Sequence, residues 1–148
     1  DITDLPATTI SINSINSFVQ ELPASKVCIF FDTCKSGAAT ASIGQIAMSR
    51  GFEEQRIIAS LAKSRGIAVF SASNETQDAY EVKSLKHGIF THSFLESIEK
   101  YRNEQGTINI AGLMSKVNRM TRDTAREYLE IDQSPIMYMF GDDFAIGK

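Results

Sequence analysis

An unbroken apolar run, Val27-Cys28-Ile29-Phe30-Phe31, gives way at Asp32 to the polar sequence Thr33-Cys34-Lys35-Ser36-Gly37. Most side chains of the run are β-branched or aromatic, which predicts a strand buried on both faces of a sheet. Polar groups directly follow this strand, and in open α/β sheets the carboxyl ends of the strands are where sites form. The run therefore predicts an α/β fold whose functional groups begin after residue 31.

Further strands and helices alternate along the chain. Apolar runs predict strands over 67–72 and 136–140, and apolar residues at three- and four-residue steps predict helices over 11–22, 53–64, 90–101 and 110–129. The polar stretch 73–86 is expected to be rich in loops. This alternation predicts a mostly parallel sheet with helices on both faces. Three strands are few for such a sheet, so we expect its first strands to lie upstream of this sequence.

Composition narrows the class of partner. The sequence has 148 residues, a net charge of −3 and 43% hydrophobic residues, which suits one soluble domain with a real core. This charge gives no reason to expect a nucleic-acid or membrane partner. The first residues have no basic start or apolar stretch, and two cysteines cannot make a disulfide framework. A reducing, cytoplasmic setting is therefore the default expectation.

The two cysteines differ in their surroundings. Cys28 lies inside the apolar run and is expected to be inert core, as free cysteines usually are. Cys34 lies past the end of the run, among polar and flexible neighbours. Cys34 is the candidate nucleophile, because a thiol attacks only as the thiolate, which needs a base or cation nearby, and Cys34 lies outside the buried run.

Several segments, in order, resemble the metacaspases and bacterial caspase-like peptidases. Asp32–Gly37 resembles their nucleophile motif D-x-C-x-S-G, and Gly66–Ser73 resembles the next strand. Gln77–Glu81 contains the similar A-Y-E segment, Gly88–Thr91 resembles G-x-F-T, and Gly141–Phe144 resembles the end of several bacterial members. The resemblance covers most of the chain and implies a caspase-like fold.

The resemblance also implies how the chain is organised. Residues 1–148 would be the C-terminal part of one peptidase domain: the nucleophile strand, a linker loop over 38–52, and a small-subunit-like region over 53–148. In such enzymes the catalytic histidine lies on an earlier strand, roughly fifty residues before the cysteine. This sequence begins too late to contain it. The expected partner is therefore the upstream half of the domain, which would carry the histidine and the first strands.

The family pattern assigns roles to the remaining site residues. Cys34 would attack the substrate, with its own backbone N–H as one oxyanion donor and a glycine beside the upstream histidine as the other. Asp32 would bind an Arg or Lys side chain of the substrate; the alternative is an Asp that caps a neighbouring turn or helix. The strand over 67–73 would offer backbone groups to an extended peptide. Ser71, Ala72 and Asn74 would line the peptide cleft there, and a solvated loop is the alternative for Asn74.

Other expectations concern activation and cofactors. The bond between Arg50 and Gly51 lies where precursors of such peptidases are often cut, so it is a candidate self-processing site. No cofactor is implied. Metacaspases often need calcium, but the adjacent pair Asp142-Asp143 does not supply the oxygen cage that calcium requires.

The two histidines of the sequence are weak candidates for a site. His87 is a weak candidate for a base, and His92 is expected to be structural; neither has cysteines or acids around it at metal-ligand spacing.

A catalytically inactive caspase-like domain, used for regulation or interaction, is the main alternative to a peptidase. A flavodoxin-type binding domain is disfavoured because no Gly-rich phosphate loop follows the first strand.

Overall fold

The computed structural model describes residues 12–32, 66–74 and 76–147. Its main sheet has three strands in the order β1 (Lys26–Phe31), β2 (Gly66–Ser71) and β6 (Ile136–Phe140). β1 and β2 run parallel and in register, so that Phe31 lies opposite Ser71. All three strands form close to where the sequence predicts them.

β6 runs antiparallel to β2, with Ile136 opposite Ser71, so the described sheet is mixed rather than mostly parallel. The reason lies in the connection. Two long helices, α5 (Ile89–Gln105) and α6 (Ile110–Leu129), follow β2. One helix would return the chain to the amino end of the sheet, as in a parallel crossover, whereas the second brings it back to the carboxyl end.

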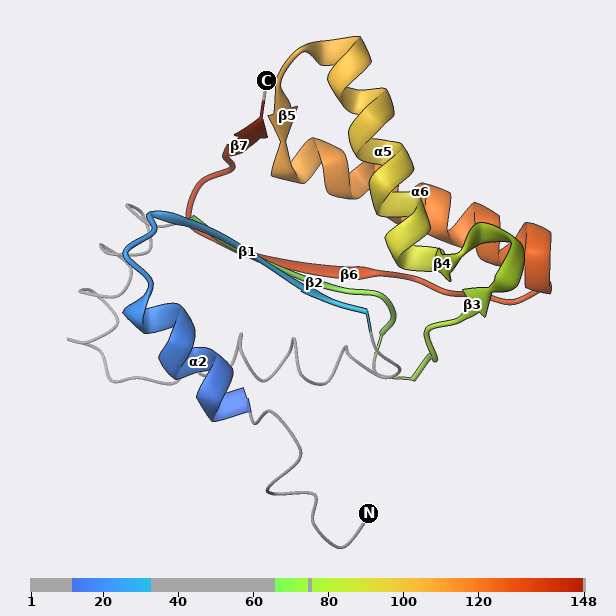
Figure 1. Cartoon of the computed structure of the whole chain (residues 1–148), viewed down its shortest axis with the longest axis horizontal. Coiled ribbons are helices and arrows are strands. Elements are labelled where there is room, and N and C mark those ends of the chain that lie inside the picture. Colours follow the sequence, from blue (N-terminus) through green and yellow to red (C-terminus); the bar gives the residue numbers. More distant parts are fainter. Residues whose placement is uncertain (1–11, 33–65, 75, 148) are drawn as a thin grey trace, which may run out of the picture.

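The helices α5 and α6 pack against each other on one side of the sheet, and Figure 1 shows α2 (Ile12–Glu21) on the other side. The predicted helix over 53–64 lies outside the described residues, so full cover of both faces stays a prediction. Within the described ranges, none of the helices combines the length and apolar character needed to cross a membrane.

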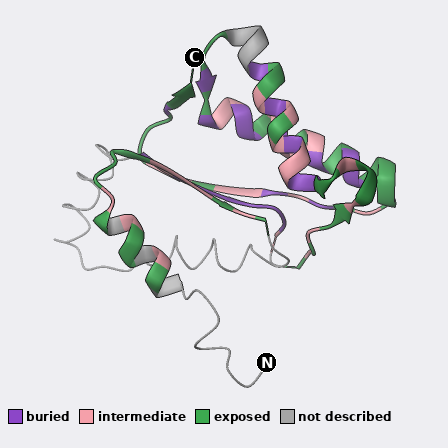
Figure 2. Cartoon of the chain, viewed as in Figure 1, coloured by how far each residue is buried: buried purple, intermediate pink, exposed green. Residues whose placement is uncertain are grey.

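The core lies between β2 and the paired helices, where Figure 2 shows the buried residues concentrated. Its members are apolar side chains of β2, α5, α6 and the short C-terminal segment, among them Ala68, Phe70, Ala72, Phe90, Tyr101, Ile110, Leu113, Met114, Val117 and Phe144. β2 is thus buried as predicted. The same prediction for residues 27–31 is wrong: β1 is half-buried and Phe30 is 39% exposed.

Three details were not predicted from the sequence. At the end of the loop-rich stretch 73–86, β3 (Glu81–Val82) and β4 (His87–Gly88) form a hairpin around a short 3-10 turn, η2 (Lys83–Leu85). Two further short strands, β5 (Ile108–Asn109) and β7 (Ala145–Gly147), pair with each other. Helix α5 also starts one residue earlier and ends four residues later than predicted.

Candidate functional site

The carboxyl ends of β1 and β2 meet at one edge of the sheet. The backbone N–H of Ala72 donates to the carbonyl oxygen of Phe31 at 2.9 Å, so the hydrogen bonding between the two segments continues one residue beyond the end of β2. Asp32 follows Phe31 directly and is exposed. The candidate nucleophile, Cys34, lies outside the described residues, as do Arg50 and Gly51.

The carboxylate of Asp32 is held against the start of α5. Thr91, in the first turn of this helix, donates a hydrogen bond from its Oγ1 to Asp32 Oδ2. Gly88 borders the same carboxylate: a Cβ added there would stand 2.8 Å from the same oxygen. The absence of a side chain at residue 88 therefore gives the carboxylate its place. The bond from Thr91 resembles the alternative in which Asp32 caps a neighbouring helix. A carboxylate has about four acceptor positions, so the exposed Asp32 can still accept hydrogen bonds from a cationic side chain.

The residues expected to line the peptide cleft have their polar groups engaged within the protein. Ser71 and Ala72 are fully buried, and Ser71 Oγ donates to the carbonyl oxygen of Ser73 at 2.6 Å. Asn74 Oδ1 accepts from both the N–H and the Oγ1 of Thr76, each at 2.9 Å, which is an Asx turn. Direct side-chain contact of these residues with substrate stays a prediction.

Their backbone placement corrects one expectation, that an extended peptide could add along residues 67–73. β2 has β1 on one edge and β6 on the other, so the N–H and C=O groups of Gly66–Ser71 are committed to two ladders. A peptide that pairs with this part of the chain must therefore lie beyond Ala72.

Sequence reasoning missed Gln133. This side chain is fully buried and contacts the backbone at two distant places: Nε2 donates to Ala72 O at 3.0 Å, and Oε1 accepts from the N–H of Tyr80 at 3.2 Å. No local pattern marks it, because a glutamine between a helix and a strand is ordinary in sequence. The only available signal was its place between the end of the predicted helix 110–129 and the predicted strand 136–140.

The remaining candidates lie apart from these contacts. His87 is exposed on β4, and His92 is half-buried on α5. Asp143, one of the two adjacent acids, is a helix cap: its Oδ1 accepts from the N–H of Ala111 at 3.1 Å, in the first turn of α6. In the part of the chain that the structure describes, no group of three or more His, Cys, Asp or Glu could hold a metal ion.

Burial raises the pKa of the Cys28 thiol to about 11. Desolvation has this effect because it disfavours the thiolate, the charged form. Cys28 therefore stays a neutral thiol at physiological pH, which agrees with the expectation that it is inert. Any thiol chemistry of this chain must come from Cys34, since the sequence has two cysteines.

Comparison with known proteins identifies the family. The family model described as the caspase domain matches residues 2–140, which is nearly the whole chain. Searches of the curated proteins and of the solved structures each return no match. The α/β architecture, the nucleophile motif after β1 and this match agree. The chain belongs to the caspase domain family, whose general activity is that of a cysteine peptidase.

Proposed function

We propose that this chain is the nucleophile-bearing part of a cysteine endopeptidase that cleaves peptide bonds after Arg or Lys. Cys34 is the nucleophile, and its histidine partner comes from the upstream half of the domain. The observation that carries the specificity is Asp32, an exposed carboxylate two residues before Cys34, held by Thr91 at the start of α5.

The reaction needs two groups at the edge where β1 ends. The upstream histidine takes the Cys34 proton, and the thiolate attacks the carbonyl carbon of the substrate to give a tetrahedral oxyanion. Backbone N–H groups, one of them that of Cys34, stabilise this oxyanion. When the C–N bond breaks, the histidine gives its proton to the leaving amine. Water then attacks the thioester, which releases the acid product and the Cys34 thiol.

Electrostatics supports a basic residue at the cleavage position. A carboxylate pairs with Lys as a point charge and with Arg through two parallel hydrogen bonds. In the described structure Asp32 Oδ2 accepts a hydrogen bond from a neutral hydroxyl, that of Thr91, so its negative charge is not neutralised by this contact. A substrate Asp would be repelled there, whereas a guanidinium or ammonium group would be attracted.

The test is an assay of the natural protein that carries this sequence, on fluorogenic peptides ending in Arg, Lys or Asp. We expect cleavage after Arg and Lys, its loss in Cys34→Ala, and a fall in kcat/KM of about 30- to 5,000-fold in Asp32→Asn, because removing one partner of a charge pair that substrate binding buries costs about 2–5 kcal/mol. Asp32→Asn keeps the size of the side chain and a carbonyl acceptor for Thr91, so it isolates the charge.

Other outcomes separate the alternatives. Cleavage after Asp that depends on Cys34 would keep the peptidase and remove the role of Asp32. No cleavage of any peptide, with and without calcium, would contradict the proposal and favour an inactive domain used for regulation or interaction.

A further inference from the structure

Gln133 joins the two ends of one segment, residues 73–79, of which the structure describes 73–74 and 76–79. Its amide donates to the carbonyl oxygen of Ala72, directly before the segment, and accepts from the N–H of Tyr80, directly after it. The network also fixes which way the amide points, since a carbonyl can only accept and an N–H can only donate. One fully buried side chain thus closes this segment at its base.

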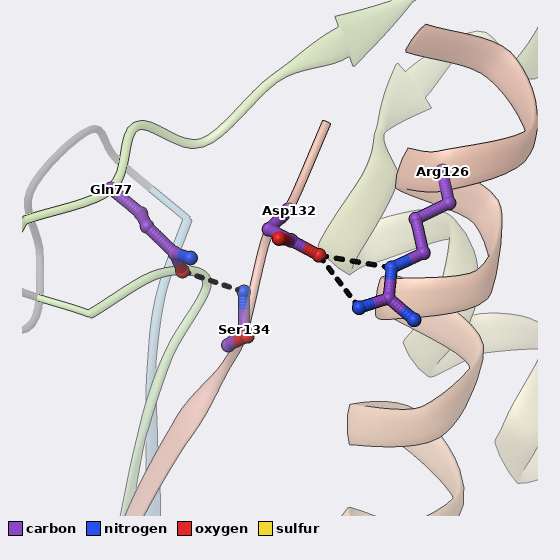
Figure 3. Close-up of polar contacts among 4 residues, drawn as sticks. All are labelled: Gln77, Arg126, Asp132 and Ser134. Carbon is purple, nitrogen blue, oxygen red and sulfur yellow. Dashed lines mark hydrogen bonds and ion pairs between the residues drawn. The ribbon is translucent and has the colours of Figure 1, made fainter. Parts of the chain in front are cut away.

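Neighbouring contacts hold the same segment. Figure 3 shows Gln77 reaching across to Ser134, whose N–H donates to Gln77 Oε1 at 2.9 Å. The carbonyl oxygen of Tyr80 accepts from the N–H of Ile89 at 2.9 Å, so both backbone groups of Tyr80 are bonded. The segment is therefore fixed at its two ends and once in between.

The connector from α6 to β6, residues 130–135, is itself anchored. Arg126 donates to Asp132 Oδ1 from Nε at 2.9 Å and from Nη2 at 2.8 Å, as Figure 3 shows. Asn118 on α6 donates from Nδ2 to the carbonyl oxygen of Pro135 at 2.7 Å. Gln133 therefore extends from a connector held on α6 to the segment that comes after β2.

Under the proposed function, a peptide substrate that pairs with the chain around β2 would lie along segment 73–79. Both edges of β2 are paired, so in this part of the chain the first backbone that can receive an extended peptide lies beyond Ala72. Ala72 is also bonded to Phe31, the residue before Asp32. The start of the segment is thus held by two bonds of Ala72, one from its N–H to Phe31 and one to its carbonyl oxygen from Gln133.

We propose that Gln133 is a positioning residue of the peptidase, which fixes residues 73–74 and 76–79 as the wall of the peptide cleft opposite the end of β1. This rests on the proposed endopeptidase function. Gln133 does not touch the substrate. It acts through Ala72 and Tyr80, and its loss leaves the buried carbonyl of Ala72 and the part-buried N–H of Tyr80 to find other partners, which frees the wall to move.

The test compares Gln133→Met with Asn118→Leu in the natural protein. Methionine fills nearly the same volume as glutamine but makes neither hydrogen bond. We expect kcat/KM for peptides to fall by about 10- to 100-fold, mainly through KM, since small displacements of binding groups have effects of this size. Alkylation of Cys34 by iodoacetamide should keep its wild-type rate, and hydrogen exchange of the Tyr80 amide should become faster.

Asn118→Leu is the matched control, because it removes one hydrogen bond to the same connector without releasing segment 73–79. It should lower stability and leave KM unchanged. An equal rise of KM in both variants would make Gln133 merely structural. Wild-type KM and exchange in folded Gln133→Met would overturn the positioning role while the endopeptidase stands. A wild-type protein that cleaves no peptide overturns both proposals.

Gln133→Glu provides a second readout if the methionine variant fails to fold. A buried carboxyl has a raised pKa, and its neutral form can donate to Ala72 O while accepting from Tyr80 N–H. The ratio of variant to wild-type kcat/KM should therefore rise as the pH falls from about 8 to about 5. A ratio that does not change with pH would contradict the positioning role.

Discussion

β1 and β2 have similar apolar sequences and lie side by side in register, yet they differ in burial and in the segments to which they lead. β2 is almost fully buried, while β1 is half-buried along its length. β2 has a strand on each edge, whereas β1 pairs along one edge in the described part of the chain. An apolar run thus predicts a strand, but its neighbours decide how far that strand is buried.

The difference extends to the segments after the strands. The chain after β1 presents an exposed carboxylate, Asp32, whereas the first two residues after β2, Ala72 and Ser73, are buried, and Gln133 bonds Ala72. Under the two proposals, β1 leads to groups that meet the substrate, and β2 leads to a fixed wall of the peptide cleft. Four predictions test this division.

The largest effect should come from removing aromatic rings of the two strands. Phe70 on β2 is fully buried, and Phe30 on β1 is stacked on it with ring centroids 4.7 Å apart. We expect Phe70→Ala to lower the free energy of unfolding by about 3–5 kcal/mol and Phe30→Ala by about 1–2 kcal/mol, measured by urea denaturation of the natural protein. Equal losses would mean that β1 is as buried as β2.

The next effect concerns the thiol of Cys28 on β1, tested in a Cys34→Ala background. Its folded-state pKa of about 11, against an ordinary 9.0, leaves about 100-fold less thiolate near neutral pH. Iodoacetamide should therefore label Cys28 about 100-fold more slowly in the folded protein than in urea. The neutral thiol contributes fully to the free energy of unfolding below pH 9, and this contribution is lost as the pH rises toward 11. Similar labelling rates in folded and unfolded protein would show that β1 does not shield the thiol.

A smaller effect is expected from Gly88→Ala, which places a Cβ 2.8 Å from Asp32 Oδ2. The carboxylate is the end of a side chain and can move, so stability should change little while KM for Arg and Lys peptides rises about 10-fold, or about 1.4 kcal/mol. The control is Gly147→Ala, where the added Cβ meets Ile108 at an ordinary 3.9 Å. A wild-type KM in Gly88→Ala would show that the position of Asp32 is unimportant.

The smallest effect should come from the exposed ion pair of Arg126 and Asp132. Both side chains are more than half exposed, so Asp132→Asn should cost at most about 1 kcal/mol of stability and less at high salt. Thermal unfolding at low and high salt measures this. A loss comparable to that of Phe70→Ala would mean that the pair, rather than Gln133 and Asn118, holds the connector.

Sequence patterns were sufficient for the longer elements among the described residues and insufficient for the contacts between them. The strands and α6 carry strong apolar signals, and α6 was predicted with the observed bounds. The bonds of Gln133 to Ala72 and Tyr80, and of Thr91 to Asp32, join residues 53 to 61 positions apart. Such contacts leave no periodic pattern in a single sequence, because folding alone brings their partners together.

The caps and short strands show the same limit. Asn109 is a good N-cap residue by type and holds the N-cap position of α6, yet its side chain makes no capping bond there. Asp143, far along the chain, bonds the first turn instead. The two-residue strands β3, β4 and β5 are likewise set by their pairing partners rather than by their own composition.

The most direct test of the proposed endopeptidase is covalent labelling with peptidyl chloromethyl ketones that end in Arg or in Asp, with mass spectrometry of the labelled peptides as the readout. We predict that the Arg reagent modifies Cys34 and leaves Cys28 unmodified, that the Asp reagent reacts far more slowly, and that Asp32→Asn removes most of this preference. Modification of Cys34 that favours the Asp reagent, or a preference for Arg that Asp32→Asn leaves intact, would contradict the role given to the carboxylate after β1.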